Sequence, residues 1–138
     1  MTTQRYDAIY WMHDDALVPP PGPCLRACYV FDTAAIRHHG YGMQRIGFIY
    51  ESLLELPVEI FRGETVPTIV SLARSSGATR VLAWSTPCPW VAQTAAAIER
   101  ELTIEWHAPE PFVELQNPVD LRRYSRYWRA TSRAALKR

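Results

Sequence analysis

The feature that most constrains the fold is a regular alternation of short β-type runs with longer helix-type runs. Runs rich in Ile, Val, Tyr, Trp and Phe predict strands at 7–12, 27–31, 58–61, 80–84 and 103–107. Apolar residues at helical spacing predict helices at 40–56, 65–76 and 89–102. This order predicts βαβ units with right-handed crossovers, and so an α/β fold with a mostly parallel sheet covered by helices on both faces.

Local signals add detail to these elements. Thr65 is a candidate N-cap for its helix, and Gly77 is a natural C-terminal stop. The segment VPPPGP at 18–23 leaves room for at most one helical turn between the first two strands, because proline lacks an amide donor. Three tryptophans fall on predicted strands and are expected in the core: Trp11, Trp84 and Trp106. The expected buried stripe of the 40–56 helix consists of Met43, Ile46, Ile49, Tyr50, Leu53 and Leu54.

Composition fits a soluble globular chain that folds as one main domain. Of 138 residues, 48% are hydrophobic and 21% are charged, and no apolar run approaches the ~20 residues of a membrane helix. Acidic residues flank the short apolar run near the N-terminus, which does not resemble a signal peptide. We therefore expect a cytoplasmic protein without a membrane partner, with an α/β domain at 1–118 and a separate segment at 119–138.

The cysteines predict neither a disulfide framework nor a metal centre. Cys24, Cys28 and Cys88 are few and odd in number, which favours reduced thiols. Cys24 and Cys28 are spaced C-x3-C, and His38 and His39 follow ten residues later. Because a zinc site needs four well-placed ligands, we interpret these residues as small core cysteines and loop histidines, and we expect no metal.

The charge is distributed unevenly along the chain. Residues 1–118 carry 8 Arg and 13 acidic residues, a balance of −5, whereas 119–138 carry seven basic residues against one Asp, a balance of +6. This segment, expected to be helical from about 119, predicts either a nucleic-acid surface, a surface that docks on a protein, or simply a solvated basic helix. The candidate partner-binding residues are Arg122, Arg123, Tyr124, Arg126, Tyr127, Trp128 and Arg129.

Polar residues gather where two of the predicted strands end. His13, Asp14 and Asp15 follow the first strand, and Ser85 and Cys88 follow the fourth. Ligands of open α/β sheets bind at the carboxyl ends of the strands, where the strand order reverses. These five residues and Trp90 are therefore the candidate ligand-binding residues, although a cluster such as His13, Asp14 and Asp15 is more often a loop that caps the next element.

Motifs of known chemistry are missing from the sequence. It contains no G-x-G-x-x-G, no Walker sequence and no G-x-S-x-G around Ser85 or Cys88. Gly40 and Gly42 precede a predicted helix whose free amides could meet an anion, but turn chemistry explains them as well. The sequence favours a chain without catalytic residues of its own.

Several segments, taken in order, resemble the N-terminal α/β domain of the DNA photolyase/cryptochrome family. YDAIYWMHDDAL is similar to that family's first strand and the stretch after it, with Asp15, Ala16 and Leu17 in matching order. ACYVFD is similar to its second strand. The most specific part is QRIGFIYESLLEL, which resembles the helix R-x-x-F-L-x-E-S-L-x-x-L. The likeness extends over residues 6–130 and ends in the aromatic and basic stretch RRYSRYWRA.

The resemblance implies a Rossmann-like, five-stranded sheet in the order 3-2-1-4-5 and a light-response or DNA-repair context. In that family a helical domain follows and holds the flavin, the lesion pocket and the electron-transfer tryptophans, and this chain ends at Arg138 where it would begin. None of those roles can be assigned to residues here. The loop STPCPW at 85–90 also departs from the family pattern, which puts binding of an antenna chromophore in doubt.

We therefore expect a stand-alone, non-catalytic photolyase-like module without a tightly bound cofactor. Its ligand would be a small aromatic or nucleotide-like molecule, such as an antenna-type chromophore or a nucleotide. Its partner would be a second copy, a separate helical flavin-domain protein or nucleic acid at the basic C-terminus. The alternatives are a nucleotide-binding regulator of the universal-stress type and a fragment of a split photolyase.

Overall fold

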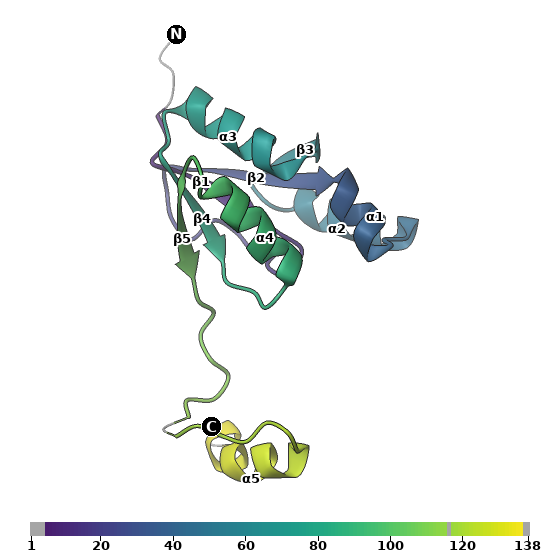
Figure 1. The fold of residues 1–138 in the computed structure, drawn as a ribbon, viewed down its shortest axis with the longest axis vertical. Coiled ribbons are helices and arrows are strands. Elements are labelled where there is room, and N and C mark those ends of the chain that lie inside the picture. Colours follow the sequence, from purple (N-terminus) through teal and green to yellow (C-terminus); the bar gives the residue numbers. More distant parts are fainter. Residues whose placement is uncertain (1–4, 116, 137–138) are drawn as a thin grey trace. The chain divides into compact units, whose positions relative to one another are not determined.

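The computed structural model describes residues 5–115 and 117–136, which form two compact units. One unit ends at Ala108 and the other begins at Pro109 (Figure 1). The elements in chain order are β1 Ala8–Met12, β2 Leu25–Asp32, α1 Thr33–His39, α2 Met43–Leu54, β3 Glu59–Gly63, α3 Thr65–Ser76, β4 Arg80–Trp84, α4 Pro89–Ile98, β5 Thr103–His107 and α5 Tyr124–Ala135.

The first unit is an α/β fold built on one parallel sheet. Its strand order is β3-β2-β1-β4-β5, and every neighbouring pair is parallel. This confirms the fold class and the strand order expected from the sequence. Because the chain leaves β1 toward β2 and later returns to place β4 on the other side of β1, the strand order reverses at β1 and β4.

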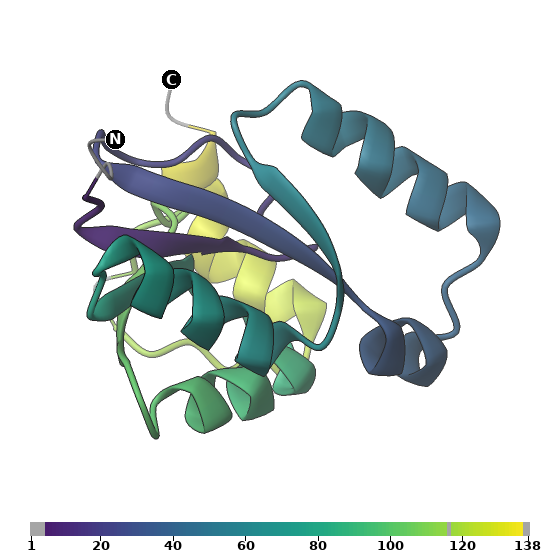
Figure 2. The same ribbon diagram turned by 90° about the horizontal axis from the view of Figure 1, so that it is seen from above.

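Alternate residues of β1 belong to two separate hydrophobic clusters, one on each face of the sheet. Ile9 and Trp11 pack in a cluster with residues of α3 and α4, whereas Tyr10 and Met12 pack with Ile49 and Leu53 of α2. Figure 2 shows α3 and α4 on one side of the strands and α2 on the other. The two-residue period of a strand thus sends its side chains into two cores.

The helix expected at 40–56 is present as α2 but is shorter, and a second helix that was not expected precedes it. An additional short helix, α1, follows β2 directly, and α2 begins only at Met43. Asp32 caps α1 by accepting from the amides of Ala34 and Ala35, and Gly40 ends it at φ 64°. His38 and His39 are therefore helical residues, and their assignment to a loop was wrong.

The expected apolar stripe of α2 is only partly buried. Ile49 and Leu53 are 3% and 1% exposed, but Met43, Tyr50 and Leu54 are 80%, 47% and 63% exposed. The stripe predicted from the sequence spanned more of the helix surface than the sheet covers. Trp106 also departs from expectation, because β5 is an edge strand and leaves this side chain 42% exposed.

Two other boundaries differ from the predicted ones. The helix expected at 89–102 ends at Ile98, and Val91, Ala95 and Ile98 are its buried residues. The C-terminal helix starts at Tyr124 rather than near residue 119.

The N-terminus of α3 is capped from outside its own chain segment. Thr65 lies inside the helix, and the residue before it, Glu64, makes no side-chain cap, so the N-cap assigned to Thr65 was wrong. Instead, the Asp32 carboxylate accepts from the amide and the hydroxyl of Thr65, at 3.0 and 2.8 Å. One carboxylate therefore satisfies the first amides of two helices.

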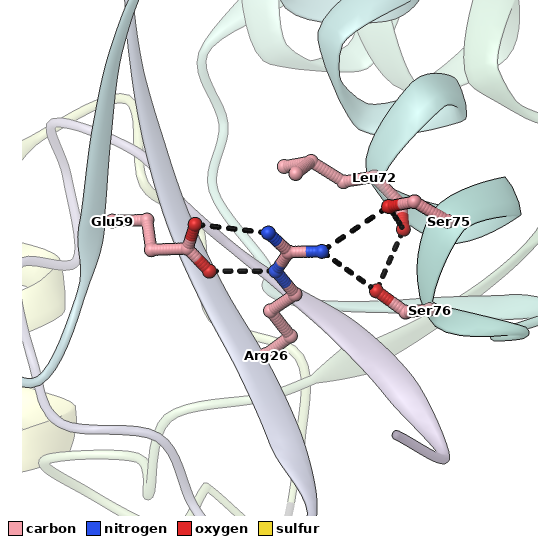
Figure 3. A network of polar contacts seen from close by, with 5 residues as sticks. All are labelled: Arg26, Glu59, Leu72, Ser75 and Ser76. Atoms are coloured by element: carbon pink, nitrogen blue, oxygen red, sulfur yellow. Dashed lines mark hydrogen bonds and ion pairs between the residues drawn. The ribbon is translucent and has the colours of Figure 1, made fainter. Parts of the chain in front are cut away.

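Arg26 connects three elements at the other end of the strands, where β2 and β3 begin (Figure 3). Its Nε and Nη2 donate to the two carboxylate oxygens of Glu59, at 2.6 and 3.0 Å, and its Nη1 donates to the hydroxyls of Ser75 and Ser76. The two serine hydroxyls in turn donate to the carbonyl of Leu72. The start of β2 is thereby joined to the start of β3 and the end of α3.

Candidate functional site

A cavity of about 390 Å³ opens at the carboxyl ends of β1 and β2 and the start of α4. We call it the crevice. Five of the six candidate ligand-binding residues line it: His13, Asp14, Asp15, Cys88 and Trp90. Ser85 does not line it; this residue is exposed and its amide donates to the carbonyl of His107 at 2.7 Å. Ligand binding by these residues stays a prediction.

The crevice also contains residues that were not predicted from the sequence. They come from the end of β2, from α1 and from the start of α2 and α3: Tyr29, Asp32, His39, Tyr41, Arg45 and Thr65. Sequence reasoning placed candidates only after the first and fourth strands and so missed the second. The spacing of Tyr41 and Arg45, one helical turn apart beside the HHGYG turn, was the available signal.

Asp14 is held by two phenols. Tyr29 and Tyr41 donate to different oxygens of its carboxylate. Burial and the hydrogen bond to Asp14 together raise the pKa of Tyr41 to about 12, and the same two causes raise the pKa of Tyr29. Both phenols therefore stay protonated near neutral pH and remain donors to Asp14.

Arg45, which is exposed, contacts the Tyr41 side of this hydrogen-bonded group of Asp14, Tyr29 and Tyr41. Its Nη2 donates to the Tyr41 hydroxyl at 3.3 Å, and its guanidinium lies 4.1 Å from the centre of the Tyr41 ring. The end of β1 is thus linked through Asp14 and Tyr41 to the first turn of α2.

Asp15 holds the loop that follows β4. The Thr86 hydroxyl donates to its carboxylate at 2.5 Å, and the Cys88 amide donates to the Thr86 hydroxyl oxygen at 3.1 Å. The two neighbouring carboxylates therefore hold opposite sides of the crevice. Asp14 orients the β2 side, and Asp15 orients the loop that follows β4.

His13 is a buried polar residue in the crevice wall, only 6% exposed. Its Nε2 lies 2.7 Å from the carbonyl oxygen of Trp84 at the end of β4. Among residues 5–115 and 117–136, no hydrogen-bond partner lies near its Nδ1. A buried polar atom without a partner is uncommon in a folded protein.

Four rings form a row beside the crevice. His38 stacks on Trp90 with ring centres 5.0 Å apart, and His39 stacks on Tyr41 at 5.5 Å. The two histidines meet edge to face at 5.0 Å. The row connects α1 to the first turn of α4, and it places flat aromatic surfaces next to the polar groups of β1.

The residues considered for a metal are not gathered at one place. Cys28 is buried in the middle of β2, where burial raises the pKa of its thiol to about 12, whereas Cys24 is exposed. Within the described part of the chain, no three His, Cys, Asp or Glu side chains are arranged to hold a metal ion.

The C-terminal candidates lie on or just before α5. Tyr124 and Trp128 stack with ring centres 6.4 Å apart, and Asp120 pairs with Arg122 and Arg126. At 100° per residue, Tyr124, Tyr127 and Trp128 fall on one side of the helix, and Arg126, Arg129 and Arg133 on the other. The aromatic and basic residues alternate in the sequence but separate onto two faces of the helix.

No protein-family model and no curated protein matches this sequence. Within the described residues, no helix combines the length and the apolar character needed to cross a membrane. The strand order 3-2-1-4-5 is also that of the first five strands of Rossmann-type dinucleotide-binding folds, so it does not single out the photolyase/cryptochrome family.

Proposed function

We propose that this chain is a ligand-binding module that holds a small aromatic or nucleotide-like molecule in the crevice. The observation that carries the proposal is the position of the cavity: it lies at the carboxyl ends of the strands where the strand order reverses. Its volume of about 390 Å³ is near the lower end of the usual range for small-molecule sites. Aromatic rings and a few polar groups line it, as in most such sites.

The residues in the crevice support binding rather than catalysis. Asp14 and Asp15 already accept hydrogen bonds from neighbouring hydroxyls, so their visible role is to orient the walls. The Tyr29 and Tyr41 phenols stay protonated, and a protonated phenol is a poor general base. The module is therefore proposed to be non-catalytic on its own.

Adenosine titration of the purified chain tests this proposal, with backbone amide NMR shifts as the measurement. We expect the shifts to concentrate on crevice residues, and we expect Trp90→Ala to weaken binding about tenfold or more, since stacking on one ring contributes ~1–3 kcal/mol. Trp106→Ala is the matched control, because Trp106 is 42% exposed on β5 and does not line the crevice. Shifts confined to α5 would contradict the proposal.

A relation to photolyases and cryptochromes remains a second proposal, motivated by the ordered motifs. If the module belongs to such a system, the flavin chemistry lies outside these 138 residues. The purified chain is then colourless and does not repair thymine dimers under blue light, because it has no electron donor. Stoichiometric flavin together with light-dependent repair by this chain alone would overturn the non-catalytic assignment.

The universal-stress alternative is less well supported. Proteins of that type hold phosphates on a Gly-rich loop after the fourth strand, whereas here that loop leads into α4 through Cys88 and Pro89. Proline at the first helical position has no amide hydrogen, so it removes one of the donors that a helix N-terminus offers to a phosphate.

A further inference from the structure

The chemical character of the ligand follows from His13, if the proposed function holds. The carbonyl oxygen of Trp84 can only accept, so the Nε2 that lies 2.7 Å from it carries a hydrogen. In the neutral imidazole, Nδ1 is then an acceptor. It is buried, it belongs to a residue of the crevice wall, and no described residue donates to it. A ligand that offers an N–H or O–H group would satisfy it once the side chains that cover this atom move aside.

The charged groups of the crevice favour the same kind of ligand. Asp14, Asp15 and Asp32 line it, and Arg45 is the one cationic side chain of Lys or Arg type among the described lining residues. Both carboxylate oxygens of Asp32 already accept hydrogen bonds from the N-termini of α1 and α3. The remaining balance is two carboxylates against one guanidinium, and that guanidinium already lies over the Tyr41 ring.

The carboxylates of Asp14 and Asp15 can each accept more hydrogen bonds than they do in this structure. Asp14 accepts one hydrogen bond at each oxygen, and Asp15 accepts one in total from a described residue. Because a carboxylate offers about four lone-pair sites, both can accept further hydrogen bonds from a ligand. An anionic ligand would instead meet like charge at the end of β1.

The aromatic groups determine the shape. Trp90, His39 and Tyr41 are aromatic residues of the crevice wall, and His39 stacks on Tyr41. Flat cations gain from lying on aromatic rings, Trp above all. The cavity, about 390 Å³, fits one or two fused rings rather than a dinucleotide.

We propose that the crevice selects a flat aromatic ligand that presents N–H donors, such as an amino- or amidino-substituted ring, and discriminates against anions of the same shape. The donor would lie between His13 Nδ1 and the carboxylates of Asp14 and Asp15. A nucleotide would then enter with its base inward and its phosphate outward.

Matched probes of one shape test this inference: benzamidine, a cation with donors only, and benzoate, an anion with acceptors only. Each is titrated into the purified full chain, and dissociation constants come from amide NMR shifts of Asp15, Cys88 and Trp90. We expect benzamidine to bind about tenfold or more tightly than benzoate, the effect of about one charge-assisted hydrogen bond. Asp15→Asn should narrow this ratio, because Asp15 is exposed and the substitution removes one charge without disturbing the core.

His13→Phe tests the acceptor itself and should weaken benzamidine more than benzoate. If that buried variant does not fold, the Asp15→Asn ratio still decides the question. Ser85→Ala is the matched control, because this exposed side chain does not line the crevice. Equal binding of the two probes, or tighter binding of benzoate, would overturn the donor preference while leaving the crevice a ligand site. If neither these probes nor adenosine moves any crevice amide, the proposed function fails, and the donor preference fails with it.

Discussion

Asp32 illustrates how one side chain can hold several elements in place. It ends β2, caps α1 through the amides of Ala34 and Ala35, and accepts from the amide and hydroxyl of Thr65 in α3. Asp32→Ala should lower the free energy of unfolding by about 2 kcal/mol, since it removes the caps of two helices. Urea unfolding measures this, with Asp7→Ala as the control because Asp7 is exposed. A loss no larger than that of the control would contradict this role.

The same residue predicts part of the acid sensitivity. Burial raises the pKa of Asp32, but the hydrogen bonds from Thr65, Ala35 and Ala34 lower it by more, so the pKa in the folded chain lies below its ordinary value. A carboxylate of this kind contributes stability above its unfolded pKa, about 3.9, and that contribution is lost as the pH falls through the folded value. The wild-type and Asp32→Ala chains should therefore differ less in stability at about pH 2 than at pH 7.

Glu59 offers a comparison between two surface ion pairs. Arg26 donates to both of its oxygens, whereas Arg80 donates to Glu105 through a single contact of 2.5 Å. The hydrogen bond from Arg26 lowers the pKa of Glu59. Glu59→Gln should cost about 1 kcal/mol near neutral pH and Glu105→Gln less, because two-point arginine contacts are the stronger kind and exposed pairs contribute little. The difference should vanish once the pH falls below the folded pKa of Glu59. Equal losses for the two variants at neutral pH would show that the bidentate geometry adds nothing.

At the scale of elements, two adjacent leucines of α2 separate its covered and uncovered faces. Leu53 is 1% exposed in the cluster with Tyr10 and Met12, and Leu54 is 63% exposed. Leu53→Ala should destabilise the chain by about 2–4 kcal/mol, through lost burial and the cavity it leaves. Leu54→Ala should stay within about 0.5 kcal/mol. Thermal or urea unfolding of the pair checks this, and similar losses would mean that a partner or another segment covers Leu54.

Strands were predictable from the sequence because β-branched and aromatic runs are short and bounded. The predicted 80–84 and 103–107 coincide with β4 and β5, and the predicted 65–76 coincides with α3. The additional helix α1 was missed because TAAIRHH contains a single large apolar residue, so it has no periodicity to detect. Its caps, Asp32 and Gly40, were visible in the sequence as N-cap and C-terminal glycine signals.

The crevice was only partly predictable for a related reason. His13, Asp14 and Asp15 follow one strand directly, so the rule for strand ends finds them. Tyr41 and Arg45 reach the same place only because α1 is present and brings the chain back toward the end of β1. A missed short helix therefore removed the part of the wall around Tyr41 and Arg45 from the prediction. The unpartnered Nδ1 of His13 could not be predicted at all, since it depends on where the carbonyl of Trp84 lies.

At the scale of the whole molecule, the membership of the two hydrophobic clusters predicts that the sheet unit folds without the C-terminal segment. Every residue that builds them lies at or before Ile104, within the unit that ends at Ala108. The charge pattern divides the chain in a similar way, with a balance of −5 over residues 1–118 and +6 over 119–138. We propose that the C-terminal segment has a different task from the sheet unit and binds a partner.

Truncation separates those two tasks. Deletion of residues 119–138 should leave the sheet unit folded, with a cooperative unfolding transition, because neither cluster loses a member. The deletion should abolish self-association or partner binding, measured by sedimentation for the chain alone and by fluorescence anisotropy with single-stranded DNA. Added salt should weaken the association that α5 supports, since its basic face interacts through screened charges. If the truncated chain does not fold, the aromatic residues of the deleted segment belong to the core of the protein, and the division of tasks is wrong.

The two faces of α5 allow the kind of partner to be identified. Replacing Arg126, Arg129 and Arg133 with Gln removes the basic face and keeps Tyr124 and Trp128, whereas replacing those two aromatic residues with Ala does the reverse. A nucleic-acid partner should be lost in the arginine variant and show a reduced salt dependence, because phosphates interact mainly with arginine and lysine. A protein partner or a second copy should be lost mainly in the aromatic variant, since buried Tyr and Trp contribute most of the energy of protein interfaces. If both variants bind as the wild type does, the segment is a solvated helix end and the binding role is refuted.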